Sequence, residues 1–462
     1  MIFGLRISIE EILLINSLVI GGTLAFWWRV LWRRGLFHWA TAGFWAWASF
    51  ALYYVLNPLF YFLSDDVWEY KLHLEIAGGT DRAFWILLVA ETGITCFFFV
   101  YLRTRCHVVG WRLSTQNKRL TVPIIIVLSF FIGLALNSLV SFRSLLIPTA
   151  REVVVIEGRF VGQVTGYESN AFAFLFVPVV FLLLSETRFQ RLIGWGLGII
   201  YTVLSIPHAW SRYATVSMVL ALALVDTVKS NKNWPRIPFI LVSILLAAVL
   251  QIRGHQQWSL ASSGSNIAEI VAQAPGRLIS VLGSKDTAML ATWYLESYIK
   301  DTITGYDYGI PLINYILTGW IPGRFFPNKY FLVDWLRDIQ PAVYSPTINM
   351  LMYGAKSSLM GSFYANGGLL GVILLMGFSG FLSRKMDGMV SNNSPSLVRA
   401  VGISWMSLLW MVWGSHDFWG ISVLGTILIP GLALWLVSPK VISMPHSSQP
   451  RSRTPLTPVR DI

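Results

Sequence analysis

Apolar runs that approach the length needed to cross a lipid bilayer dominate this chain. A membrane-spanning helix needs roughly 20 mostly apolar residues. Eleven stretches are candidates: 9–29, 39–61, 83–102, 120–141, 171–186, 192–208, 212–228, 237–252, 363–382, 400–414 and 420–437. Only 13% of the 462 residues are charged, whereas a soluble protein usually carries about twice that fraction. The sequence therefore predicts an all-α polytopic membrane protein with about eleven transmembrane helices.

The distribution of basic residues predicts the topology, because Lys and Arg collect in short cytoplasmic loops. With the N-terminus outside, the inner segments hold 20 of the 35 Lys and Arg residues, and the short outer segments hold seven. The remaining eight lie in one long outer loop, which the rule does not count. We therefore expect a multi-pass protein of the bacterial inner (plasma) membrane with a periplasmic N-terminus and a cytoplasmic C-terminus.

This topology divides the chain into four parts. Residues 1–252 hold helices 1–8, with outer loops at 62–82 and 142–170. Residues 253–362 form one large periplasmic loop, in which ISVLGSKDTAMLATWYLESYIKD predicts one or two amphipathic helices. Residues 363–442 carry the last three helices, and the Ser-, Pro- and Arg-rich tail 443–462 is typical of a disordered segment.

Several classes of function find no support in the motifs. The net charge of +12 fits basic cytoplasmic loops better than nucleic-acid binding. There is no glycine loop that would cradle a phosphate, no His-Glu-x-x-His and no Gly-x-Ser-x-Gly, and none of the seven histidines are paired at metal-ligand spacing. We expect neither a metal nor a nucleotide cofactor.

Arginine and lysine at the outer ends of the helices are the main candidates for a binding site. A guanidinium suits bidentate binding of phosphate oxygens, and Arg212 also precedes a helix, whose first amides favour anions. The alternative is structural: long basic side chains near helix ends extend to the membrane surface, and loop carboxylates pair with arginines. The candidates that recur in the outer loops are Arg151, Arg159, Arg212, Arg253, Arg324 and Lys329.

Three short stretches resemble the O-antigen polymerase (Wzy-type) and O-antigen ligase superfamily. SRYATVSMVLALAL is similar to the start of a helix in that family. SSLMGSFYANGGLLGVILLMG (357–377), which includes Tyr364, is similar to the segment that leaves the large loop and re-enters the membrane. IPGRFFPNKY (321–330) is similar to a loop segment of oligosaccharide repeat-unit polymerases. The spacing of an arginine and a glycine eleven positions later, described in two outer loops of some of these polymerases, occurs from Arg151 and from Arg253.

The resemblance implies a GT-C-like architecture and a reaction. A glycan on undecaprenyl pyrophosphate would be transferred to a new lipid-linked repeat unit without a metal or a nucleotide sugar. Arg212 and Arg253 would stabilise the charge of the leaving pyrophosphate, and Tyr364 joins the substrate-binding candidates. The implied partners are undecaprenyl-pyrophosphate-linked oligosaccharides, membrane lipids and a chain-length regulator.

The general base is open. Ligases of the superfamily carry a histidine where the large loop re-enters the membrane, and this chain has Ser357 and Ser358 there. His255 is the first candidate for a base near neutral pH, with an exposed interfacial histidine as the alternative. The loop carboxylates are unranked alternatives, and several aromatic residues are candidates for stacking on sugars or for anchoring at the interface. The carboxylates are Asp286, Glu296, Asp301, Asp307, Asp334 and Asp338; the aromatic residues are Tyr167, Trp258, Trp293, Tyr294, Trp320 and Tyr344.

Other functions compete with a polymerase. A ligase is the nearest enzyme, and the missing histidine counts against it. A flippase for lipid-linked sugars would usually show internal repeats and mid-membrane charges. The clearest intramembrane carboxylate here is Glu91, for which structural pairing with another helix is the simpler interpretation. A non-catalytic scaffold of an envelope complex would not need the outer arginines.

Overall fold

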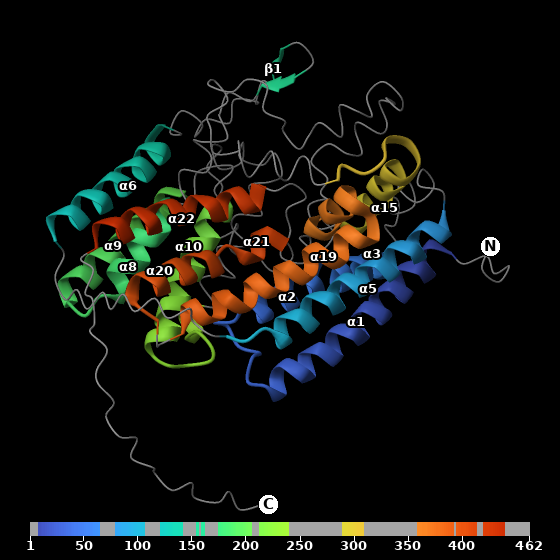
Figure 1. The fold of residues 1–462 in the computed structure, drawn as a ribbon, viewed down its shortest axis with the longest axis horizontal. Helices are drawn as coiled ribbons and strands as arrows, with labels where there is room; N and C mark the ends of the chain where they lie inside the picture. Colours follow the sequence, from blue (N-terminus) through green and yellow to red (C-terminus); the bar gives the residue numbers. More distant parts are fainter. Residues whose placement is uncertain are drawn as a thin grey trace, which may run out of the picture.

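The computed structural model describes the protein in eleven segments and is helical except for one small hairpin (Figure 1). The described residues are 8–64, 79–106, 121–141, 154–156, 159–161, 174–205, 212–239, 289–308, 358–391, 394–413 and 419–438. The hairpin pairs β1 (Val154–Ile156) with antiparallel β2 (Arg159–Val161). It is an addition to the expected all-α fold, and Val154, Val155 and Ile156 are β-branched residues that favour strands.

The first part of the chain contributes the helices α1 (Ile9–Arg33), α2 (Ala42–Ala51), α3 (Asn57–Ser64), α5 (Thr80–Arg103) and α6 (Val122–Ser141). A π-helical turn, η1 (Leu52–Leu56), joins α2 to α3. The start of α1 is set by a capping box. The Ser8 hydroxyl accepts from the Glu11 amide at 3.2 Å, and the Glu11 carboxylate accepts from the Ser8 amide at 2.7 Å.

The rest of the chain adds α8 (Phe176–Leu184), α9 (Arg188–Ser205), α10 (Arg212–Lys229), α15 (Met289–Ile299) with the π-turn η4 (Lys300–Thr304), α19 (Ser358–Val390), α20 (Ser396–Met406), α21 (Leu409–Trp413) and α22 (Trp419–Val437). In Figure 1, α1, α2, α5 and α19 lie together in one half, and α6, α8, α9, α20 and α22 lie together in the other. Helix α20 contacts both α19 and α8 and so joins the two halves.

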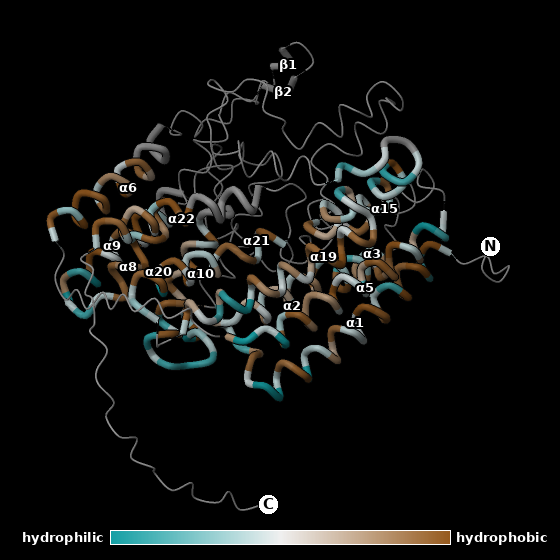
Figure 2. The backbone as a smooth tube through the Cα atoms, in the orientation of Figure 1, coloured by the Kyte–Doolittle hydropathy of each residue, from teal (hydrophilic) through white to brown (hydrophobic). Residues whose placement is uncertain are grey.

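Among the described residues, four helical segments are long and apolar enough to cross a membrane, and these are Ile9–Arg33, Ala42–Leu63, Thr80–Arg103 and Ser358–Val390. Every predicted run except 237–252 coincides with a described helix, and 237–252 lies almost entirely outside the described residues. On α19, Leu370, Leu374, Phe378 and Phe381 repeat every three or four positions and are exposed, as a lipid-facing stripe would be. Figure 2 shows apolar residues along the helices and polar residues mainly at their ends. The structure therefore fits a helical membrane protein, and the number of eleven spans remains a prediction.

Helices α5 and α19 approach each other closely. A Cβ built on Gly380 would lie 2.3 Å from the carbonyl oxygen of Phe97, and a Cβ on Gly93 would lie 2.8 Å from Cγ1 of Val372. Small residues let helix backbones meet in this way within a membrane. On α5, Glu91 points to α1, where the Thr23 hydroxyl donates to its carboxylate at 2.6 Å. The expected structural pairing of Glu91 with another helix is confirmed.

The helices bring the basic segments together at one end of the bundle, called here the basic end. Four contacts join these segments to one another: Arg34 Nη1 to Leu102 O at 3.4 Å, Trp39 N to Asn233 O at 3.0 Å, Lys229 Nζ to Leu183 O at 2.9 Å and Lys385 Nζ to Arg105 O at 3.3 Å. The opposite ends of α5 and α19 contact α15 and η4, and this end is called the α15 end.

Candidate functional site

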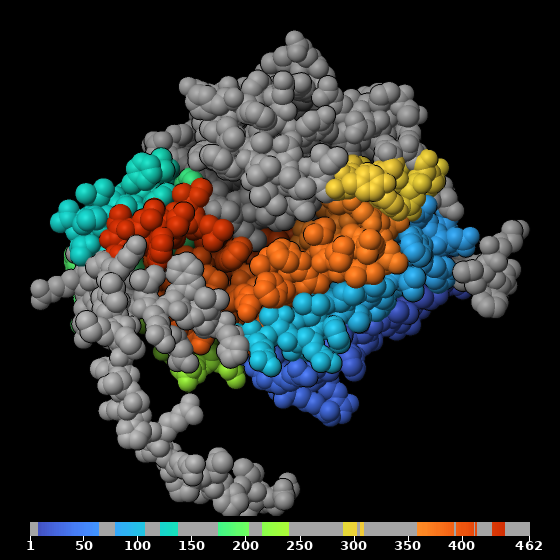
Figure 3. All heavy atoms as spheres, in the orientation of Figure 1, coloured from blue at the N-terminus to red at the C-terminus, as the bar shows by residue number. Residues whose placement is uncertain are grey.

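Helix α15 is a short helix that is buried on nearly every side. Its eleven residues are too few to span a bilayer, and Figure 3 shows α15 and η4 lying against α19. Trp293 and Tyr294 are fully buried, and the amide of Asn16 on α1 donates to the Tyr294 hydroxyl at 2.5 Å. Thr292, Glu296 and Ser297 are buried as well, so α15 lacks the exposed polar face of an amphipathic helix. The expectation of an amphipathic helix is therefore wrong for this segment, and Trp293 and Tyr294 are core residues without access to sugars.

The chain leaves α15 through a π-turn that carries two charged residues, Lys300 and Asp301. Gly305 follows with a φ of 75° and ends the turn. Single π-helical turns of this kind occur often at functional sites. The turn directs the two charged side chains to different environments. Lys300 is buried, whereas the side chain of Asp301 keeps 19% of its surface exposed.

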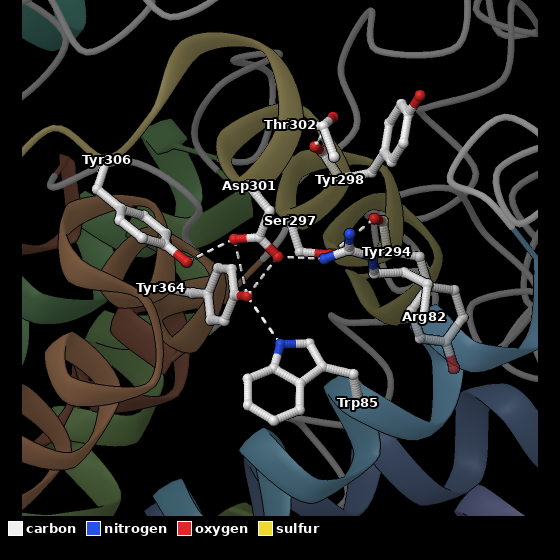
Figure 4. A network of polar contacts seen from close by, with 9 residues as sticks. All are labelled: Arg82, Trp85, Tyr294, Ser297, Tyr298, Asp301, Thr302, Tyr306 and Tyr364. Atoms are coloured by element: carbon white, nitrogen blue, oxygen red, sulfur yellow. Dashed lines mark hydrogen bonds and ion pairs between the residues drawn. The ribbon is translucent and has the colours of Figure 1, made fainter. Parts of the chain in front are cut away.

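The Asp301 carboxylate is the centre of a polar network between three elements (Figure 4). Arg82, near the start of α5, forms an ion pair with it. The Tyr306 hydroxyl donates to Oδ1 at 2.5 Å, and the Tyr364 hydroxyl on α19 lies 2.8 Å from Oδ2 and 3.0 Å from Oδ1. The Trp85 indole in turn donates to the Tyr364 oxygen at 2.8 Å. One carboxylate thus joins α5, η4 and α19.

A second ion pair secures the segment that follows η4. The Lys300 ammonium contacts Asp307 Oδ1 at 2.7 Å, and its side chain is only 1% exposed. The Asp307 amide donates to the carbonyl oxygen of Ala365 on α19 at 3.0 Å. A buried ammonium without a counter-ion would be costly, so the ion pair fixes the position of Asp307, whose amide then holds the 305–308 segment against α19.

Helix α19 bends at the level of this network. Gly367 and Gly368 have non-helical backbone angles, and Gly368 has a φ of 59°. A Cβ on Gly368 would lie 2.8 Å from the Tyr306 hydroxyl oxygen. The glycine pair thus lets residues 358–366 turn under α15, and this turn brings Tyr364 to Asp301.

The Tyr306 phenol remains a donor over a wide pH range. Partial burial, followed by its hydrogen bond to the negatively charged Asp301, raises the pKa of the Tyr306 hydroxyl above its usual value. The Arg82 guanidinium makes a further, cation–π contact, because it lies 5.9 Å from the centroid of the Tyr298 ring. The site therefore combines a fixed carboxylate with phenol and guanidinium donors.

Ser358 has a structural role at the position where a histidine would be expected from the resemblance to the O-antigen ligases. It is buried, has a φ of 72°, and its hydroxyl is hydrogen-bonded to the Tyr54 hydroxyl on η1. The Ser358 hydroxyl also accepts from the Gly361 amide at 3.4 Å. These contacts seat the first residue of α19 against η1.

Three of the predicted site residues lie within the described part of the chain. Tyr364 lies in the Asp301 network, Arg159 begins β2, and Arg212 begins α10. The other end of α10 is at the basic end, where Lys229 binds the end of α8, so Arg212 lies at the opposite, α15 end. Outside the described residues lie Arg151, Arg253, His255, Arg324 and Lys329, and their assignments remain predictions.

Sequence reasoning did not single out Arg82, Trp85 or Tyr306. Arg82 is a basic residue in a short outer segment that precedes an apolar run, which is the same signal that selected Arg212. Asp301 was one of six unranked loop carboxylates, and only its contacts distinguish it from the others. Within the described part of the chain, no group of three or more His, Cys, Asp or Glu side chains is arranged to hold a metal ion.

No protein-family model, curated protein or solved structure matches this chain. The family resemblance thus depends on the short stretches quoted above and on the layout of the chain. The site has to be interpreted from its own geometry.

Proposed function

We propose that this chain is a membrane glycosyltransferase that polymerises undecaprenyl-pyrophosphate-linked oligosaccharide repeat units into O-antigen or exopolysaccharide. It resembles the Wzy-type polymerases, and it acts on the periplasmic face of the inner membrane without a metal or a nucleotide sugar. The α15 end is the periplasmic end, the basic end is cytoplasmic, and about eleven helices span the membrane. The substrates arrive through the lipid, and a chain-length regulator is the expected protein partner.

The observation that carries this proposal is that three features lie on the same side of the bundle, the α15 end. Arg212 begins α10 there, a helix of the long outer loop is buried there, and the bent start of α19 brings Tyr364 to Asp301 there. The basic segments lie at the other end. A site for an anionic, lipid-linked sugar at the membrane surface would be assembled from these parts.

The proposed reaction uses the predicted residues in named roles. The acceptor hydroxyl oxygen bonds to C1 of the donor sugar, its proton passes to a base, and the bond between C1 and the pyrophosphate oxygen breaks. The pyrophosphate leaves with the electron pair, and Arg212 and Arg253 stabilise its charge. The backbone amides in the first turn of the helix after Arg212 also stabilise this negative charge. His255 remains the first candidate for the base.

A ligase and a flippase are the alternative functions. A ligase transfers the glycan to a lipid acceptor, and the buried, hydrogen-bonded Ser358 at the re-entry position is not a base. A flippase moves a lipid-linked sugar without breaking a bond. Only the polymerase lengthens a glycan in steps of one repeat unit, so the product distinguishes the three.

The test is a reaction of purified protein with lipid-linked repeat units and no nucleotide sugar. We expect a ladder of products from the wild type and a loss of about 100- to 1000-fold in rate for Arg212→Ala, as for removal of one charge-stabilising donor. Arg188→Ala is the matched control, because Arg188 also begins an 18-residue helix but at the basic end. A wild-type protein that makes no ladder would exclude the polymerase. Equal rates for Arg212→Ala and Arg188→Ala would remove Arg212 from the site.

A further inference from the structure

The solvent side of the Asp301 network presents an aromatic residue that the contacts above do not use. Tyr308 has 76% of its surface exposed and a φ of 50°, which is unusual for a bulky residue. Its ring centroid lies 6.4 Å from that of Tyr306, and the Tyr306 centroid lies 5.9 Å from that of Tyr364. A row of three tyrosines thus runs from the core of the bundle to solvent.

In the described part of the chain, the charged side chains that contact this row are paired with one another. Arg82 pairs with Asp301, and Lys300 pairs with Asp307. A site for a phosphate would have an excess of positive charge, and a site for a cation would have an excess of carboxylates. The balance here instead favours a neutral ligand that makes hydrogen bonds.

The hydrogen-bonding groups and rings match the surface of a sugar. The Asp301 carboxylate accepts hydrogen bonds, as from the Tyr306 hydroxyl, and a sugar hydroxyl offers the same O–H donor. The Arg82 guanidinium presents further N–H donors beside it, with 16% of its side chain exposed. An exposed tyrosine ring supplies a flat apolar face with a polar edge, to which the C–H face of a pyranose is complementary.

Strain at Tyr308 is a second, independent observation. A bulky side chain in the left-handed region has to be held there by its surroundings, and such residues gather at functional sites. Two neighbours hold it there: Gly305 turns the chain with a φ of 75°, and the Asp307 amide donates a hydrogen bond to α19. The segment thus fixes an exposed ring next to a carboxylate.

We propose that Arg82, Asp301, Tyr306 and Tyr308, named here the tyrosine patch, form a binding site for the uncharged saccharide part of a lipid-linked substrate. Tyr308 stacks on a sugar ring, and Asp301 accepts from sugar hydroxyls, one of which takes the place of the Tyr306 hydroxyl at Oδ1. The pyrophosphate of the substrate lies elsewhere, because the patch has no excess of positive charge to hold it. The identity of the saccharide rests on the proposed function, whereas the sugar-binding property rests on the patch itself.

The experiment measures binding rather than activity. The probe is the repeat-unit oligosaccharide released from its lipid carrier by mild acid, and saturation-transfer NMR in detergent gives its Kd for the purified full chain. We expect Tyr308→Ala to weaken binding by about tenfold or more and Tyr308→Phe to bind like the wild type, because Phe retains the ring. Asp301→Asn is expected to weaken binding without changing the shape of the side chain.

The control is Trp32→Ala, which removes another exposed aromatic residue at the basic end. It should leave the Kd unchanged. Absence of oligosaccharide binding to the wild type, or an equal Kd for wild type and Tyr308→Ala, would overturn the site. Binding that depends on Tyr308 in a protein that makes no product ladder would support the site and reject the polymerase, so the two proposals fail separately.

Discussion

The hydroxyl of Tyr364 lies 2.8 Å from Oδ2 of Asp301 and so joins the helix that follows the long loop to the π-turn within that loop. Tyr364 also accepts from the Trp85 indole on α5. Three segments that are far apart in the sequence therefore meet at one phenol.

Replacement of Tyr364 by Phe should loosen the attachment of α15. The change removes the hydrogen bond to the carboxylate and leaves the Trp85 N–H without its acceptor. A hydrogen bond to a charged group contributes about 1.5–3 kcal/mol, and we expect a loss of that order in the free energy of unfolding, measured by SDS titration. Tyr308→Phe, which removes an exposed hydroxyl, is the control. If the two variants are equally stable, the Tyr364 contact does not hold the site together.

The two adjacent glycines in the bend of α19 should respond differently to alanine. Gly368 has a positive φ, and a Cβ there would lie 2.8 Å from the Tyr306 oxygen, whereas the Cβ of an alanine at 367 would meet nothing within 4 Å. A residue in an unfavourable backbone region costs about 1–3 kcal/mol. We expect Gly368→Ala to lower the thermal stability clearly and Gly367→Ala to lower it much less. Similar losses for both would show that the bend does not depend on Gly368.

Contact between α5 and α19 should not tolerate a side chain at position 380. A Cβ there would lie 2.3 Å from the Phe97 carbonyl oxygen, so one of the two helices has to move. Overpacking of this kind costs about 1–3 kcal/mol. Gly133→Ala on α6 is the matched control, because a Cβ there would meet nothing within 4 Å. Melting temperatures of the two variants in the same detergent test this, and a Gly380→Ala protein as stable as Gly133→Ala would contradict it.

His38 should make the protein less stable in mild acid. The residue lies between the first two candidate spans, and burial lowers its pKa below 6.5. The folded state then prefers the neutral ring, while the unfolded chain binds a proton below about pH 6.5, so the stability falls as the pH drops below that value. We expect the melting temperature to fall less for His38→Gln than for the wild type between pH 7.5 and pH 5.5. Parallel curves for the two proteins would rule out this contribution.

Much of the helical framework follows from local sequence. Nearly every predicted apolar run coincides with a described helix. A run of about 20 apolar residues has few other stable conformations in a membrane. The capping box of Ser8 and Glu11 marks the start of α1 in the same local way. The predicted start of the ninth apolar run at 363 differs from the observed start of α19 at Ser358, because residues 358–366 form a short helical segment before the glycine bend.

The site depended on information that local sequence does not contain. Asp301 was indistinguishable from five other carboxylates in the loop until the fold placed Arg82, Tyr306 and Tyr364 around it. The segment of Trp293 and Tyr294 was expected to be amphipathic, but the burial of a helix depends on what surrounds it. A short apolar helix in a loop has the same composition whether it lies on a membrane surface or inside a bundle.

The sequence by itself determined the helical membrane class, the positions of most helices and the grouping of the basic segments, because hydrophobicity and charge act on each segment independently. Only the tertiary structure decided which polar residues meet. It bent α19 at Gly367 and Gly368 and buried α15 against α5 and α19. It brought Arg82 to Asp301 across 219 residues of chain and Tyr364 to Asp301 across 63. Contacts at that separation arise from the packing of whole helices, and no pattern within a single segment records them.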